Sequence, residues 1–228
     1  MSVGGIIALV LFLTAPLDAA ERMTRFVAQP ESKVRIDGKG TIHDWQAEGR
    51  LINGSLEAGD NFPIEPRQQV KPGKVNARIE VSIPVNSLED VDLNGKSSGK
   101  TMNNLLHRFL KEQTNPRIQY QLNELFLKSS PNSEDSGYQF DSQGSLVVAG
   151  VTNQISMPMR VTPFGDGRLK ITGNVNLKMT DFGIQPPVGK IASDAKTNEW
   201  REFRLSEDEI KLGFEWFLEP APIAAQKK

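Results

Sequence analysis

The sequence predicts an all-β fold, a single antiparallel β-barrel of about eight strands with one short amphipathic helix. Two observations support this class. Apolar and polar residues alternate along most of the chain, and a period of two places the apolar side chains on one face of a strand. The 228 residues include no Cys, so disulfides cannot stabilise the fold and a large hydrophobic core must do so.

The clearest predicted strand covers residues 75–85, where apolar residues alternate with polar ones from Val75 to Val85. Pro84 has no amide donor, so we expect it at the end of this strand or at a bulge. Residues 146–149 and 155–161 form a predicted hairpin around a tight turn at 150–153. Residues 169–179 and 210–218 form a second pair, each with one apolar face. Weaker strands are predicted at residues 34–40, 45–55, 118–127 and 138–142.

One stretch has a helical period instead. Its apolar residues recur at the spacing of one helix face, at Met102, Leu105, Leu106, Phe109 and Leu110. Thr101 is the expected N-cap, and Asn115-Pro116 is expected to end the helix. Such a helix either covers a barrel mouth as a lid or packs outside the sheet, and the sequence leaves both arrangements open.

Two segments are predicted to be long loops, residues 53–74 and residues 182–208. The chain contains no internal repeat and no linker that would divide it, so residues 21–228 are expected to form one domain.

The first 20 residues have the features of a secretory signal peptide. An apolar run at residues 6–13 is followed by small residues at Ala15, Ala19 and Ala20, and the run is much shorter than the roughly 20 residues that span a membrane. We expect cleavage after Ala19 or Ala20, no membrane span afterwards, and a periplasmic or secreted protein. An uncleaved interfacial anchor is the alternative, because the segment contains no Lys or Arg.

Charge and residue content exclude several functions. Without the signal segment, whose only charge is Asp18, basic and acidic residues are equal in number. Nucleic-acid surfaces and polybasic membrane patches need an excess of Lys and Arg, so neither is expected. The expected partner is a small apolar molecule or a protein, and the chain is a monomer or a homodimer.

Catalytic, metal and cofactor sites are not predicted. The only histidines are His43 and His107, and Asp44 cannot orient its neighbour His43 because adjacent strand residues point to opposite faces. A metal site needs three or four converging ligands, which two distant His residues and no Cys do not supply. We therefore expect a protein that is not an enzyme.

Several short motifs, in order along residues 32–218, resemble the YceI-like family of lipid- or polyisoprenoid-binding, lipocalin-like proteins. They lie at residues 34–38, 42–45, 81–88, 115–118, 144–152, 178–187 and 208–210. The resemblance implies an extended antiparallel barrel of lipocalin type, with a long isoprenoid chain or another amphiphile in its interior.

An interior of this kind would be lined by adaptable Met side chains together with aromatic and aliphatic ones. The candidate ligand-binding residues are Trp45, Met102, Leu106, Phe109, Tyr120, Leu146, Val148, Met157, Met159, Met179, Phe182, Phe214 and Trp216. Rim residues such as Arg35, His43, Asn103 or Asp181 would select a polar head.

The expected function is to sequester or carry an elongated apolar ligand, such as a polyisoprenoid, a quinone or a similar lipid. Two alternatives stay open. One is a structural or interaction protein whose barrel is filled by its own side chains and whose long loops bind a partner. The other is an enzyme acting on a sequestered lipid, for which the sequence offers only His43 and scattered carboxylates.

Overall fold

The computed structural model describes residues 23–92, 94–131, 137–194 and 199–222. The predicted signal peptide at residues 1–20 lies outside the described residues. The strands before the helix are β1 (Thr24–Ala28), β2 (Lys33–Gly38), β3 (Trp45–Gly49), β4 (Asn53–Ala58), β5 (Gly73–Lys74), β6 (Ala77–Pro84) and β7 (Leu88–Val91). After helix α1 (Lys100–Phe109) come β8 (Arg117–Ser129), β9 (Tyr138–Val148), β10 (Val151–Pro163), β11 (Leu169–Lys178), β12 (Val188–Asp194), β13 (Glu199–Arg204) and β14 (Glu209–Pro220). Two short 3-10 helices are η1 (Val85–Ser87) and η2 (Met179–Phe182).

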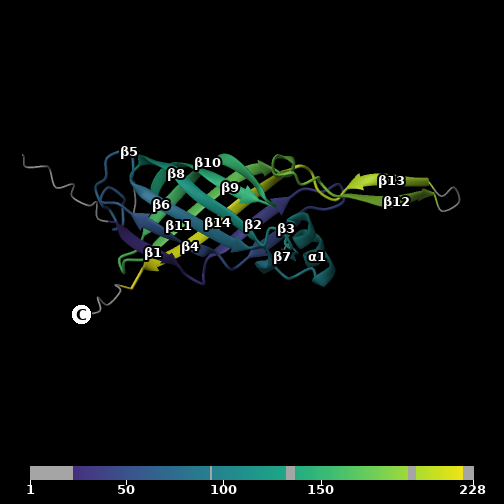
Figure 1. The fold of residues 1–228 in the computed structure, drawn as a ribbon, viewed down its shortest axis with the longest axis horizontal. Helices are drawn as coiled ribbons and strands as arrows, with labels where there is room; N and C mark the ends of the chain where they lie inside the picture. Colours follow the sequence, from purple (N-terminus) through teal and green to yellow (C-terminus); the bar gives the residue numbers. More distant parts are fainter. Residues whose placement is uncertain (1–22, 93, 132–136, 195–198, 223–228) are drawn as a thin grey trace, which may run out of the picture.

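Eight strands close into an antiparallel barrel in the order β1, β4, β6, β8, β9, β10, β11 and β14, and β14 pairs with β1 to complete the ring (Figure 1). The mostly β fold, the eight strands of the barrel and the one α-helix among the described residues confirm the predicted fold class. The two predicted strand pairs also form, as β9 with β10 and as β11 with β14.

The barrel is longer at one end because β14 extends past the end of its partner β1. Residues Leu218–Pro220 of β14 pair with β1, whereas Ile210–Glu215 pair with β2. Between β1 and β2, Pro30 has no amide hydrogen to donate. Ser32 Oγ bonds the Phe217 backbone there, donating to its carbonyl at 3.3 Å and accepting from its amide at 3.0 Å. From β2 the sheet continues to β3 and β7, beyond β1, β4 and β6. The predicted strand at residues 45–55 is thus two strands, β3 and β4, separated by residues 50–52.

Local details correct several expectations. Pro84 ends β6 as predicted. The turn between β9 and β10 is tighter than predicted, because only Ala149 (φ 51°) and Gly150 (φ 84°) lie between the strands. Two residues with positive φ match the twist of paired strands, so β10 begins at Val151.

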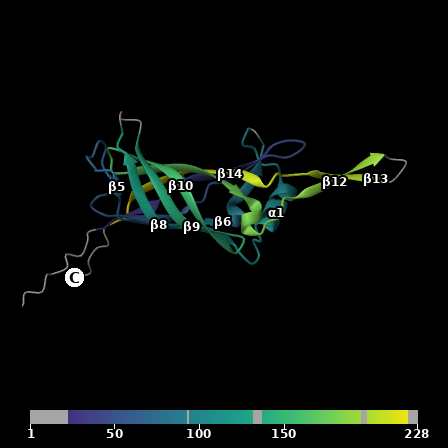
Figure 2. The same ribbon diagram turned by 90° about the horizontal axis from the view of Figure 1, so that it is seen from above.

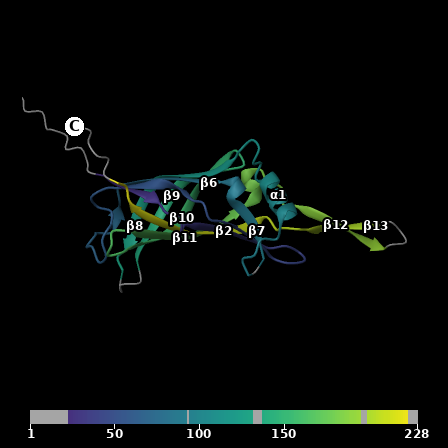
Figure 3. The same cartoon turned by 90° about the horizontal axis from the view of Figure 1, so that it is seen from below.

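Both predicted loops contain strands. Residues 53–58 form β4 and residues 73–74 form β5, so the connection between them is limited to residues 59–72. Within residues 182–208, β12 and β13 form a separate two-stranded sheet that projects beyond the barrel (Figure 3). Trp200 and Val188 in this hairpin are exposed. Apolar residues that face solvent do not give the in-out alternation by which the barrel strands are recognised.

Helix α1 begins and ends earlier than predicted. Its N-cap is Gly99, without a side-chain capping bond, and Thr101 lies in the first turn. The helix ends at Phe109, six residues before Asn115, and Lys111 adopts a positive φ of 55°. It packs on the edge strand β7. The helix lies at one end of the barrel (Figure 2). Asn103 Oδ1 accepts a hydrogen bond from the Asp90 amide at 2.8 Å, and His107 Nε2 lies 2.8 Å from the Leu88 carbonyl oxygen.

The opposite end of the barrel is filled by side chains. The connection at residues 59–72 folds across it, and the Phe62 ring stacks on Phe140 with centroids 5.8 Å apart. Tyr138 Oη donates to the Gln68 carbonyl at 2.8 Å, which holds the connection in place. The barrel is therefore closed at this end, and its core continues toward the α1 end.

Candidate ligand-binding cavity

A narrow cavity lies inside the barrel between the filled end and the α1 end. Its volume is about 70 Å³. One water needs roughly 10–15 Å³, so a few small groups fit without rearrangement. A slender chain therefore needs less widening of this space than a bulky ligand does.

The burial of the inward-facing residues shows which end is closed. Trp216, Met159 and Ile171 are each less than 5% exposed, and we call these three the cavity floor. Toward the α1 end, the inward residues of the same strands, Val175 on β11 and Leu212 on β14, are only partly buried. The inward-facing residues of these strands are therefore less covered toward the end where η2 and α1 lie, and we call this the open end.

The barrel wall is also divided between β10 and β11. Register pairs join Met159–Pro163 to Leu169–Gly173, and toward the open end no further pair joins the two strands within the described residues. The division begins beside Pro158, which has no amide hydrogen to donate. Farther toward the open end, the Asn153 Nδ2 donates to the Asp181 carbonyl in η2 at 2.8 Å, so η2 connects to β10 there. The inward residues Ile155 and Val175 flank the divided part and line the cavity.

Two aromatic rings lie along the wall because glycines on neighbouring strands leave room for them. A Cβ at Gly144 would fall 2.5 Å from atoms of the Tyr120 ring, and a Cβ at Gly173 would fall 2.8 Å from the Phe214 ring. Tyr120 and Phe214 both line the cavity. If either glycine carried a Cβ, the ring beside it would have to move, and the space available to the ring is the barrel interior.

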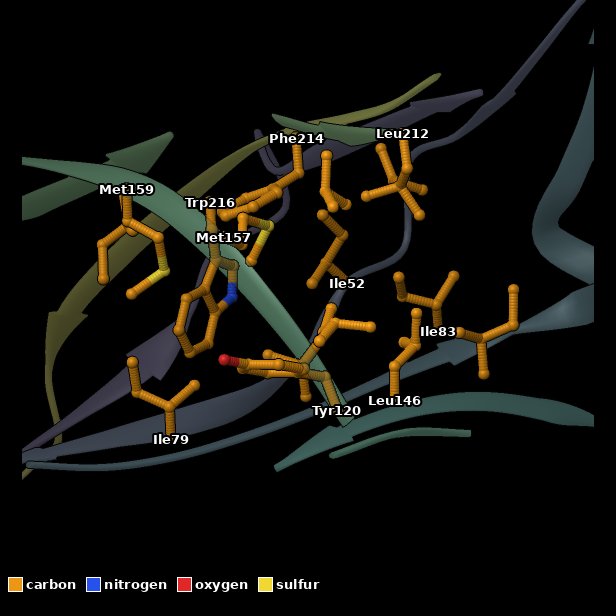
Figure 4. Close-up of a pocket in the computed structure, with 16 residues that line it drawn as sticks. Ile52, Ile79, Ile83, Tyr120, Leu146, Met157, Met159, Leu212, Phe214 and Trp216 are labelled. Atoms are coloured by element: carbon orange, nitrogen blue, oxygen red, sulfur yellow. The ribbon is translucent and has the colours of Figure 1, made fainter. Parts of the chain in front are cut away.

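The cavity lining carries hydrogen-bonding nitrogen or oxygen on two side chains, Tyr120 and Trp216, and no charged group (Figure 4). Tyr120 Oη donates to Ser142 Oγ at 3.4 Å, and Ser142 Oγ donates to the Met157 carbonyl at 2.8 Å. Burial raises the pKa of Tyr120 above its ordinary value, although the Ser142 bond acts in the opposite direction. Tyr120 is therefore neutral at physiological pH, and the interior favours uncharged molecules.

The histidines lie away from the cavity lining. His43 is exposed, with Nδ1 3.1 Å from the Asp44 carbonyl oxygen. His107 is on α1, where Nδ1 lies 3.3 Å from Glu112. The described residues contain no group of three or more His, Cys, Asp or Glu side chains that could hold a metal ion.

The cavity brings together six of the candidate binding residues, which are Tyr120, Leu146, Met157, Met159, Phe214 and Trp216. Trp45, Met102, Leu106, Phe109, Val148, Met179 and Phe182 are outside its lining. Trp45 lies over Gly38, Met102 is exposed on α1, and Leu106 and Phe109 pack against the core from α1. Val148, Met179 and Phe182 are buried near the open end.

Ten lining residues were not among the candidates, and all are aliphatic: Val34, Ile52, Ile79, Val81, Ile83, Ile118, Ile155, Ile171, Val175 and Leu212. Their alternation identified most of them as inward-facing. Aliphatic side chains carry no signal that separates a cavity wall from a packed core, so the sequence does not mark them as binding residues.

These features define a lipocalin-like barrel, closed at one end, with an apolar interior cavity. The family model described as "YceI-like domain" matches residues 22–215. The chain belongs to the YceI-like family, as its motifs predicted.

Two solved structures share this fold. One is a polyisoprenoid-binding domain from Saccharophagus degradans implicated in plant cell wall breakdown, which is 10% identical, with a TM-score of 0.56 over 88% of this chain and 100% of that one. The other is BcnA from Burkholderia cenocepacia, 14% identical, with a TM-score of 0.55 over 83% of this chain and 98% of that one. Identities this low show a common fold only. No curated protein matched the chain significantly.

Among the described residues, no helix has both the length and the apolar character that crossing a membrane requires.

Proposed function

We propose that this protein sequesters or carries an elongated apolar ligand, such as a polyisoprenoid, a quinone or a similar amphiphilic lipid, inside its barrel. The observation that carries the proposal is the interior cavity, whose lining has no charged side chain and which is closed at the floor by Trp216, Met159 and Ile171. The similar fold of a polyisoprenoid-binding domain supports it. We infer a carrier and not an enzyme, because the lining contains no acid, base or nucleophile poised for reaction.

Burial of hydrocarbon is sufficient to hold such a ligand. Each sequestered CH₂ group contributes about 0.8 kcal/mol, so ten carbons contribute roughly 8 kcal/mol before the costs of association. Binding in the micromolar range needs about that much net free energy, so a longer chain compensates for the costs. A salt bridge is not needed.

A branched or bulky chain needs more room than the cavity has at present. Met157 and Met159 line it, and unbranched thioether side chains change rotamer at little cost. The division between β10 and β11 gives the wall a second way to widen, because no ladder bonds need to break there. We propose that both accommodate the ligand.

Native mass spectrometry of the protein purified from its own cells, without detergent, tests this function. The bound species is then extracted and identified. A stoichiometric hydrophobic compound is the expected result. A ligand-free mass that is unchanged after incubation with isoprenoid lipids would overturn the proposal.

A second candidate, an interaction protein with a self-filled barrel, is favoured by one observation. The β12–β13 hairpin projects from the barrel and exposes Trp200 (61%) and Val188 (55%). Exposed aromatic residues are common in protein interfaces. The native mass spectrum distinguishes the two functions, because a carrier retains a ligand and a self-filled barrel does not.

We propose further that residues 1–20 are a signal peptide, that the mature protein is periplasmic or secreted, and that residues 21–228 form one domain. N-terminal sequencing of the protein from cell fractions tests the signal peptide and the location. A mature chain starting at Ala20 or Glu21 is expected, and a chain that retains residues 1–20 in the cytoplasm would overturn the proposal.

A further inference from the structure

Trp216 presents a hydrogen-bond donor at the cavity floor. Its side chain is 2% exposed, and no hydrogen-bond acceptor among the described residues lies within reach of Nε1. An indole N–H can only donate, and buried donors in folded proteins almost always have a partner. The unpaired donor therefore indicates that something other than the described protein groups accepts this hydrogen.

The described groups around Trp216 provide no acceptor for this hydrogen. Met157, Met159 and Ile79 lie near it in the cavity, and Nε1 points into the space between the walls (Figure 4). Ser142 is the buried hydroxyl of this region, but its Oγ already donates to the Met157 carbonyl and accepts from Tyr120. The floor therefore combines apolar walls with one free donor.

We propose that the ligand carries a neutral acceptor oxygen, of the carbonyl, quinone or ether type, on the part that reaches the floor, where Trp216 Nε1 donates to it. This inference rests on the proposed function and specifies its ligand class. An ionised phosphate or carboxylate does not fit, because the lining holds no cation to compensate a buried negative charge. The oxygen-bearing part enters first, and the apolar remainder extends toward the α1 end.

Two small probes of similar shape separate the hydrogen bond from hydrophobic burial. Methyl hexyl ketone carries an acceptor oxygen, and octane does not. Headspace gas chromatography over solutions of the whole protein measures the binding of both. The change Trp216→Phe keeps an aromatic ring and removes the donor. We expect it to weaken ketone binding about tenfold and octane binding less than about threefold. The change Met159→Leu, also at the floor, should leave the ratio of the two affinities unchanged.

Three outcomes are decisive. If Trp216→Phe weakens both probes equally, Trp216 is only part of the wall and the inference fails while the proposed function stands. If neither probe binds wild-type protein from which any bound compound has first been extracted, the proposed function fails and this inference fails with it. If ketone binding alone is weakened, the donor role is established.

A measurement on the wild-type protein covers the case in which Trp216→Phe does not fold. The chain has three Trp residues, so its indole N–H signals can be assigned by NMR with Trp45→Phe and Trp200→Phe. A new hydrogen bond should move the Trp216 signal downfield when the ketone is added but not when octane is added. An equal response to both probes would overturn the inference.

Discussion

The Tyr120 ring lies directly against Gly144 across the β8–β9 pair, so that a Cβ at position 144 would be 2.5 Å from ring atoms. Both residues belong to the inner face of the barrel, and Tyr120 lines the cavity. Glycine at this position lets a large ring occupy the wall instead of the interior, so the width of the cavity depends on a missing side chain on the neighbouring strand.

We therefore expect Gly144→Ala to reduce ligand binding. The added methyl group pushes the Tyr120 ring toward the interior and should also cost about 1–3 kcal/mol of stability through overpacking. Headspace binding of octane and urea unfolding measure the two effects. Addition of Tyr120→Leu to the Ala variant should restore binding, because the displaced ring is then absent.

The matched control is Gly165→Ala, since a Cβ there would meet no atom within 4 Å. It should change neither binding nor stability beyond about 0.5 kcal/mol. If Gly144→Ala behaved like this control, the ring would not determine the width of the cavity.

Ser142→Ala should destabilise the fold by about 1–3 kcal/mol, because the Met157 carbonyl and the Tyr120 hydroxyl both lose a buried partner. Tyr120→Phe removes only the longer bond, 3.4 Å against 2.8 Å, and should cost less. Urea denaturation at neutral pH compares the two. Equal losses would mean that the bond to Met157 contributes little.

Alkaline pH should unfold the protein through its tyrosines. Burial raises the pKa of both Tyr120 and Tyr138 above the ordinary value of 10.0. The folded state thus holds these protons more tightly than the unfolded state, so their contribution is constant below pH 10 and the free energy of unfolding falls as pH rises above it. Denaturant unfolding between pH 9 and about 11 measures the loss. Tyr120→Phe should make it smaller, and an unchanged pH dependence in that variant would contradict the assignment.

The sequence predicted the barrel well because one face of each long strand is apolar. Alternation at residues 75–85, 155–161 and 210–218 identified strands that the structure contains. It could not place the interruptions, since the break between β1 and β2 depends on a bond between Ser32 and Phe217, which are far apart in the chain. The β12–β13 hairpin was not predicted, because its apolar residues Val188 and Trp200 are exposed and show no alternation between a core and solvent.

The cavity could be predicted only in part. Trp216, Met157 and Tyr120 were recognised as inward-facing residues of a barrel. The aliphatic side chains around them carry no signal that marks them as lining, and Met102 and Phe109 of the amphipathic helix lie outside the lining. Whether a given inward residue faces space or packs against a neighbour depends on partners such as Gly144, which no period in the sequence identifies.

Acid should weaken the connection of β14 to its neighbours on both sides. Glu215 pairs with Lys170 of β11 and Lys33 of β2, and hydrogen bonds from Lys170 first and then Lys33 lower its pKa. The stabilisation is present above the ordinary value of 4.5 and is lost as pH falls through the lower pKa of the folded state. Because Glu215 is partly exposed, we expect its ion pairs to contribute at most about 1 kcal/mol to the free energy of unfolding. Glu215→Gln should remove this part of the acid dependence, measured by denaturant unfolding between pH 6 and about 3.

The division between β10 and β11 should be visible in hydrogen exchange. Amides of residues 151–157 and 174–178 that face the neighbouring strand have no ladder partner across it, whereas those of the Met159–Pro163 segment do. We expect the first group to exchange at least about tenfold faster, because their exchange needs no opening of the sheet. A bound apolar ligand should slow the exchange of these amides by filling the space beside Ile155 and Val175. Equal protection of both groups in NMR exchange would show that the strands close together in solution, and ligand would then have to enter only through the open end.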